Sequence, residues 1–207
     1  MGMKTIAVGI TGGSGAPYAL RLLNALVTMG YDAHVAISAA GETILAMEAG
    51  LKLSGGVREK QDALSAAIEA DGKPGSIRLF ELANVAAPIA SGSFPTLGMV
   101  VVPCSTGTLG RIAGGISSNL IERAADVTLK ERRPLVLVPR ETPLSDIHLR
   151  NMLTLRSAGA DILAAMPAFY HKPKTISDLV DMIVGRVLDR LGIENELFLR
   201  WNGETPR

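Results

Sequence analysis

Short runs of aliphatic residues recur along this chain, and none approaches the length of about 20 residues that spans a bilayer. The clearest is Met99–Val102, which shows no alternation of polar and apolar residues and so must be covered on both faces. The other runs are 5–10, 32–37, 135–138 and 161–166. Stretches with helical spacing separate them. The pattern predicts an α/β protein with a three-layer α/β/α Rossmann-like (flavodoxin-like) fold and a mainly parallel sheet of about six strands.

No linker or internal repeat divides the chain, so residues 1–207 are predicted to form one domain. The strongest apolar stripe at helical spacing lies in Thr175–Leu191. The other predicted helices are 16–29, 39–50, 59–70, 107–113, 119–132 and 145–158. Residues 51–76 are small, polar and rich in glycine, and we interpret them only as a partly helical excursion. The C-terminal tail, about residues 192–207, is expected to pack on a neighbouring subunit.

Composition excludes several classes of function. The formal net charge of +1 provides no basic field for nucleic acid, and no segment is expected to enter a membrane. The first residues lack the features of a signal peptide, and Cys104 is the single cysteine, so we expect a cytoplasmic protein without disulfides. His34, His148 and His171 are scattered and lack the spacing of metal ligands, so no metal site is expected.

A glycine-rich turn, Gly9–Gly15, connects the first predicted strand to the first predicted helix. Glycines allow backbone N–H groups to approach an anion, and a helix N-terminus adds a positive partial charge. The turn lacks the lysine of a P-loop and the full dinucleotide fingerprint. It therefore indicates a ligand that carries phosphate, with a tight turn capped by Ser14 as the alternative.

Polar residues follow three more predicted strands. Ser38 ends the second strand, and Cys104–Thr108 follows the most buried one. Ser38 could cap the next helix or bind a ligand. The hydroxyls of Ser105, Thr106 and Thr108 could form a cradle for an anion or an isoalloxazine ring. Cys104 is interpreted as a small buried hydrophobe, because no basic residue that could activate it is near in sequence. Arg140 and Glu141 stand side by side after Leu135–Val138, at an edge where open α/β sheets bind ligands, which points to chemistry on an anion.

Together these segments resemble the UbiX-type flavin prenyltransferases, which lie within the flavin-containing cysteine decarboxylase-like superfamily. The similarity runs from about residue 4 to residue 201. The segments that carry it are Gly9–Gly15, Ala90–Phe94, Cys104–Leu109, Pro139–Leu144, His148–Met152, Pro167–Tyr170 and Asp181–Arg186. Gly13 departs from the alanine that is commoner in the family, and Ala164-Ala165 stands where prolines are common.

The resemblance implies a flavin-binding domain that transfers a dimethylallyl group from dimethylallyl phosphate to N5 and C6 of reduced FMN, without a metal. The product, prenylated FMN, would be passed to a UbiD-type decarboxylase. The subunits would form a dodecamer, with sites completed across subunit contacts. The compact set of cations favours the monophosphate over the diphosphate as donor.

The resemblance also implies the role of each site residue. FMN would be held by Gly12, Gly13, Ser14, Ser38, Ser105, Thr106, Gly107, Thr108 and Arg140. The donor would be held by Ser91, Gly92, Arg123, Lys130, Glu141, Tyr170 and Arg186. Catalysis would involve Ser14, Glu48 at the flavin N5, Glu141 as general acid, and Trp201 over the prenyl group.

Several of these residues have plainer interpretations when taken alone. Glu48 fits a surface carboxylate, Arg123 and Lys130 a solvated helix face, Tyr170 a core position, and Arg186 a snorkelling side chain. Two alternative functions also stay open on the same fold. One is a flavin-dependent decarboxylase of peptidyl or pantothenoyl cysteine, and the other is a flavin carrier without catalysis.

Overall fold

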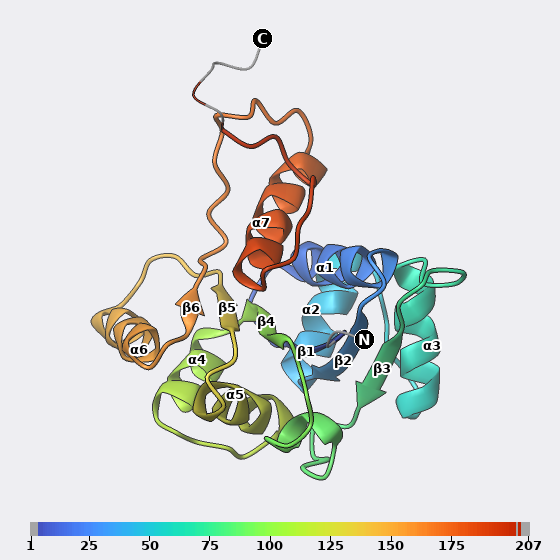
Figure 1. Ribbon diagram of the computed structural model, residues 1–207, viewed down its shortest axis with the longest axis vertical. Helices are drawn as coiled ribbons and strands as arrows, with labels where there is room; N and C mark the ends of the chain where they lie inside the picture. Colours follow the sequence, from blue (N-terminus) through green and yellow to red (C-terminus); the bar gives the residue numbers. More distant parts are fainter. Residues whose placement is uncertain (1–3, 202, 204–207) are drawn as a thin grey trace.

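Six parallel strands form the central sheet of the computed structural model, which describes residues 4–201 and 203. They are β1 (Thr5–Ile10), β2 (Asp32–Ile37), β3 (Ile77–Phe80), β4 (Gly98–Cys104), β5 (Leu135–Pro139) and β6 (Asp161–Ile162). Their order in the sheet is β3-β2-β1-β4-β5-β6, with every neighbouring pair parallel (Figure 1). This is the Rossmann strand order, and the predicted fold class is confirmed.

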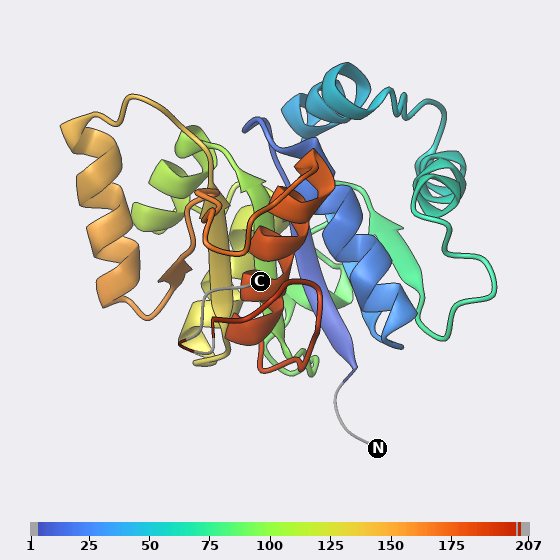
Figure 2. The same ribbon diagram turned by 90° about the horizontal axis from the view of Figure 1, so that it is seen from above.

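Helices cover both faces of the sheet. They are α1 (Ala16–Thr28), α2 (Ala39–Ala49), α3 (Val57–Ala67), α4 (Thr106–Ala113), α5 (Leu120–Lys130), α6 (Asp146–Ser157) and α7 (Ile176–Arg190), with a 3-10 turn, η1, at Pro88–Ala90. Figure 1 shows α1 and α7 on one side of the sheet and α4 and α5 on the other. Seen from above, α3 and α6 lie at opposite ends of the molecule (Figure 2).

The apolar core has one part on each face of the sheet. Ile6, Val8 and Ile10 of β1 point into the cluster formed with α1, α2, α3 and α7. The alternate residue Ala7 belongs to the second cluster, with α4, α5 and α6. Every residue of β4 is buried, as its unbroken apolar run predicted.

The outer strands differ from the prediction. The sequence pattern did not identify β3, a strand of 4 residues in which Arg78 is exposed. The expected strand over 161–166 is only 2 residues long, and the chain then leaves the sheet. Both are edge strands, which pair with a neighbouring strand on one side only. Their residues are therefore less buried, and their sequences show a weaker apolar pattern.

The sheet has two edges that bear different loops. The loops after β1, β2, β4 and β5 leave from the carboxyl edge, because all strands are parallel. Each connecting helix returns antiparallel to the strands, so its last turn lies toward the amino edge. A residue's place in its helix therefore decides which edge it can reach.

The tail after α7 folds back on the same chain. Ile193 and Phe198 are buried, Asn195 donates to the Gly185 carbonyl (3.2 Å), and Arg200 pairs with Asp189 (2.7 Å). Part of the tail thus packs on α7 of its own chain, while Leu199 and Trp201 stay exposed, and the expectation that the tail contacts a neighbouring subunit stays a prediction. Residues 202 and 204–207 lie outside the described part.

Within the described residues, no helix is both long and apolar enough to cross a membrane. The same part of the chain contains no group of three or more side chains that could hold a metal ion.

Candidate functional site

Thr11 joins the loop after β1 to the loop after β4. Its hydroxyl donates to the Pro103 carbonyl (2.8 Å) and accepts from the Ser105 N–H (2.8 Å), while its own N–H also donates to Pro103 (3.1 Å). Thr11 is only 1% exposed, so these bonds are sheltered from water. The two loops are thereby fixed relative to each other at the carboxyl edge.

Packing requires a glycine at position 12 and not at position 13. A Cβ on Gly12 would come within 2.5 Å of the Ala40 Cβ, whereas one on Gly13 would lie at an ordinary contact distance of 3.4 Å from the Cys104 backbone. Gly12 thus lets the turn lie against α2. Among the described residues, no acceptor bonds the N–H groups of Gly12, Gly13 or Ser14, which leaves these donors for a ligand.

Glu48 occupies the N-terminus of α1, where the sequence predicted an external anion. Its Oε2 accepts from the N–H groups of Gly15 (2.8 Å) and Ala16 (2.9 Å), and its carboxylate also bonds the Ser14 side chain. The protein's own carboxylate thus satisfies these two donors, and the predicted phosphate contact of the turn rests on Gly12, Gly13 and Ser14. Glu48 is a surface carboxylate near the end of α2, as the plainer interpretation has it, and it is engaged in these hydrogen bonds.

Electrostatics keep Glu48 ionised. Partial burial acts to raise the pKa of its carboxyl, but the hydrogen bonds from Ser14, Gly15 and Ala16 and the charge of Arg140 outweigh it, so the pKa is lowered. Arg140 also acts on Tyr18, whose pKa is nevertheless raised because burial dominates. Tyr18 was not among the predicted site residues. The feature that could have indicated it is its position, an aromatic residue in the first turn of the helix after the glycine-rich loop.

Ser38 and Ser105 cap helices at the same edge. Ser38 Oγ accepts from the Gly41 N–H (3.0 Å) at the start of α2, and Ser105 Oγ accepts from the Thr108 N–H (3.2 Å) at the start of α4. The capping role considered for Ser38 is confirmed, and Ser105 has the same role at the start of α4. Cys104 is fully buried and burial raises the pKa of its thiol to about 12, which confirms it as a core residue.

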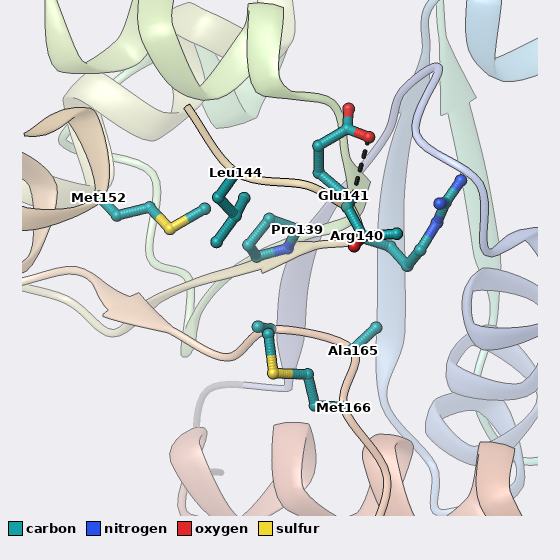
Figure 3. A pocket seen from close by; sticks show the side chains of 9 residues that line it. Pro139, Arg140, Glu141, Leu144, Met152, Ala165 and Met166 are labelled. Carbon is teal, nitrogen blue, oxygen red and sulfur yellow. Dashed lines mark hydrogen bonds between the residues drawn. The ribbon is translucent and has the colours of Figure 1, made fainter. Parts of the chain in front are cut away.

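Arg140 and Glu141 line a cavity of about 520 Å³ at the end of β5. The apolar part of its wall is formed by Pro139, Leu144, Met152, Ala164, Ala165 and Met166. In Figure 3, Leu144 and Met152 lie on one side and Ala165 and Met166 on another, while Arg140 extends away from Met152. Arg140 makes no ion pair in the described part of the chain, so its charge is available to an anion.

A second cluster of expected site residues lies apart from this cavity. Lys130 ends α5, just before β5, and so lies toward the amino edge. Its Nζ is 2.5 Å from Glu131 and would be 2.8 Å from a Cβ on Gly92. Ser91 follows η1, and Arg123, in the second turn of α5, donates to the neighbouring Ala90 carbonyl (3.2 Å). Ser91, Gly92 and Lys130 therefore lie toward the opposite edge of the sheet from Arg140.

Tyr170 and Trp201 form a third group beside α7. Their rings meet edge to face, with centroids 5.9 Å apart, and Trp201 is 58% exposed. The core role considered for Tyr170 is wrong, since the residue is 38% exposed. Arg186 lines a smaller cavity of about 300 Å³, which shares Ala164 and Met166 with the cavity at Arg140. Arg186 thus adjoins the cavity at Arg140 from the side of α7, whereas Tyr170 and Trp201 line neither cavity.

An all-parallel sheet of this order, with a glycine-rich turn, capped loops and a free arginine at its carboxyl edge, defines a Rossmann-like domain that binds a phosphate-bearing ligand. The family model described as Flavoprotein matches residues 1–188. The flavin prenyltransferase UbiX of Halalkalibacterium halodurans is 50% identical to the chain over 95% of its length and 93% of the relative. The chain belongs to the UbiX family of flavin prenyltransferases, as the sequence predicted.

Two solved structures are similar over nearly the whole chain. AnUbiX (PadA1) in complex with FMN and dimethylallyl pyrophosphate has a TM-score of 0.85 and 42% identity, covering 98% of this chain and 100% of that one. The dodecameric FMN-dependent UbiX-like decarboxylase from Escherichia coli O157:H7 has a TM-score of 0.83 and 42% identity, covering 96% and 100%. The prediction of an enzyme is confirmed by this family, and neither alternative function is supported.

Proposed function

We propose that this chain transfers the dimethylallyl group of dimethylallyl phosphate to reduced FMN and releases prenylated FMN. The observation that carries the proposal is the end of β5, where an unpaired arginine and a carboxylate line a cavity with apolar walls. An allylic phosphate has the matching chemistry, a charged head on a short hydrocarbon. A related protein binds FMN together with a dimethylallyl donor on the same fold.

The carboxyl edge has the groups that FMN requires. The free N–H groups of the 12–14 turn and the Arg140 guanidinium suit a phosphate, and the hydroxyls of Ser38, Ser105, Thr106 and Thr108 suit polar atoms of the flavin. Gly107 is exposed and leaves open space beside α4. Reduced FMN supplies the nucleophilic N5 and C6 atoms. Glu48, held ionised beside Ser14, is placed to accept a proton in this region.

The donor is bound by charge at one end and by apolar contact at the other. Leu144, Met152 and Met166 form a wall for the dimethylallyl group, and excluding water there strengthens the attraction between a phosphate and Arg140. When the C–O bond of the donor breaks, Glu141 gives a proton to the departing phosphate. The proton lost from N5 balances it. Ring closure at C6 would add one proton to the prenyl double bond and release the proton of C6, so the net products are inorganic phosphate and prenylated flavin.

The remaining donor residues come from another copy of the chain. Ser91, Gly92 and Lys130 lie toward the opposite edge of the sheet from Arg140, so one copy cannot close the site by itself. A relative at 42% identity is a dodecamer. The α6 helix, beside the cavity, buries only Leu155 and exposes Ile147, Leu149 and Leu153, as a helix does when a second subunit covers it.

The second cluster then supplies the phosphate-binding charges, Arg123 and Lys130, while Tyr170, Arg186 and Trp201 complete the wall toward α7. Trp201 presents an exposed aromatic face that could steady positive charge on an allyl group. The product passes to a UbiD-type decarboxylase in the cytoplasm, where a reduced flavin and a lone thiol are both stable.

Anaerobic incubation with reduced FMN and dimethylallyl phosphate, followed by mass spectrometry of the flavin, tests this function. We expect a mass gain of one prenyl unit. We also expect Glu141→Gln to bind FMN normally but to transfer the prenyl group about 100-fold more slowly, because an amide cannot donate the proton. Unchanged flavin in a stable complex would support a carrier instead, and full activity of the variant would remove Glu141 from the mechanism.

A further inference from the structure

Arg133 fastens the loop 91–96 to the end of α5. Its Nη2 donates to the Gly92 carbonyl (2.6 Å), and its Nη1 donates to the Phe94 carbonyl (2.8 Å) and the Thr96 hydroxyl (3.3 Å). We propose that Arg133 is a positioning residue for the donor phosphate, because it sets where Ser91 and Gly92 stand relative to Lys130. The inference rests on the proposed function, in which these three residues bind that phosphate.

The backbone after α5 brings Arg133 to this loop. Arg132 has a left-handed conformation (φ 55°), and the Arg133 N–H bonds back to the Thr128 carbonyl at 3.0 Å. The tight reversal places the ammonium of Lys130 and the guanidinium of Arg133 on one short segment. Any shift of that segment relative to the loop would therefore disturb both together.

Few other bonds hold the loop. Within it, the Phe94 N–H donates to the Ser91 carbonyl (3.2 Å), and the Phe94 ring stacks on His34 with centroids 5.4 Å apart. Among the described residues, Arg133 is the donor that bonds the Gly92 and Phe94 carbonyls. A guanidinium supplies these bonds from a rigid planar fork, which a lysine cannot reproduce.

The fit at Gly92 makes the position of the loop critical. A Cβ there would collide with Glu131 and lie 2.8 Å from Lys130 Nζ, so the loop backbone already lies against this ion pair. A displacement of about 1 Å is enough to weaken a positioned anion contact. Arg133 itself touches no residue of the carboxyl-edge cavity, so FMN binding should not depend on it.

Arg133→Met and Arg133→Lys test the inference, with Arg132→Met as the matched control that removes one positive charge from the adjacent residue. For Arg133→Met we expect the KM for dimethylallyl phosphate to rise about tenfold and kcat to change less than threefold, with unchanged FMN affinity and Tm. Arg133→Lys should share most of the KM defect, because it keeps the charge but not the fork. Calorimetric binding of dimethylallyl phosphate to the enzyme–FMN complex should weaken in parallel.

A KM for Arg133→Met equal to that of Arg132→Met overturns the inference. So does a parallel loss of Tm, FMN affinity and kcat, which marks a merely structural residue. If Arg133→Met fails to fold, a wild-type KM for Arg133→Lys overturns the inference by itself. Failure of the wild-type enzyme to prenylate the flavin is a different result and counts against the proposed function.

Discussion

Glu48 shows how a single residue on α2 can organise the loop before α1. Its carboxylate accepts hydrogen bonds from two backbone N–H groups at the start of α1 that would otherwise have no partner. The positive charge of Arg140 contributes to lowering the pKa of this carboxyl group. The same residue therefore stabilises the turn and adds a negative charge beside the expected flavin site.

Replacing Glu48 with Gln should destabilise the protein by about 1 kcal/mol at neutral pH, a value reduced for the partial exposure of the side chain. Because the folded-state pKa is below the reference value of 4.5, the stabilisation is fully present above pH 4.5. It is lost as the pH falls below that value, through the folded-state pKa. Urea unfolding of both proteins between pH 3 and pH 7, a range chosen around the carboxyl pKa, measures the difference.

The exposed Glu196 provides a control, since Glu196→Gln removes the same charge away from any helix N-terminus. Its unfolding should match the wild type across the range. A gap between wild type and Glu48→Gln that widened toward acid pH would contradict the assignment of Glu48 as an ionised cap.

At the scale of elements, the site depends on how β1 and β4 end together. Thr11 is the joint between them, because its hydroxyl both donates to Pro103 and accepts from Ser105. Thr11→Val keeps the shape but leaves the Ser105 N–H without its acceptor, and the Pro103 carbonyl keeps only the bond from the backbone N–H of residue 11. We expect a loss of about 2 kcal/mol in stability and about tenfold weaker FMN binding, measured by thermal unfolding and flavin fluorescence titration.

Thr11→Ser retains the hydroxyl and should behave nearly as wild type in FMN affinity. If Thr11→Val lost stability but bound FMN normally, the hydrogen bonds of the Thr11 hydroxyl would contribute to folding and not to FMN binding.

The elements themselves were predictable where burial acts on both sides of a strand. β1, β2, β4 and β5 carry apolar runs that are followed by threonine, serine or arginine, and the predicted bounds of each strand lie within a residue or two of the observed ones. β3 and β6 were missed or overextended because an edge strand has a neighbour on one side only. Contacts between distant segments, such as Glu48 with Gly15, leave no periodic signal in the sequence.

At the scale of the whole molecule, the residues expected to bind FMN lie mainly at the carboxyl edge, whereas Ser91, Gly92 and Lys130, which are expected to bind the donor, lie toward the amino edge. The reason is direction: α5 runs against the strands, so its last residue, Lys130, ends far from the loops that follow β4 and β5. The residue types in the sequence indicate a phosphate site, but the edge of the sheet at which each residue lies follows from the strand order and the direction of the helices. The contacts between subunits depend on surfaces formed by distant segments, and a local sequence pattern does not predict such surfaces.

A site divided between copies predicts that two defective chains can repair each other. Lys130→Met damages the half near the amino edge, and Glu141→Gln damages the half at the end of β5. Each homo-oligomer should transfer the prenyl group about 100-fold more slowly than wild type. In mixed oligomers, some sites combine the intact Lys130 of one chain with the intact Glu141 of another.

Co-expression with two different affinity tags and sequential purification isolates the mixed oligomers. At equal proportions, about one site in four is intact when its halves come from different subunits, so activity should return to about a quarter of wild type. A double variant, Lys130→Met with Glu141→Gln in one chain, co-expressed with wild type, is the control for tag and assembly effects and should give the same fraction. If the two single variants together gave no more activity than either alone, Lys130 and Glu141 of each site would belong to one chain. A movement within the subunit would then be needed to bring the two edges of the sheet to the same donor.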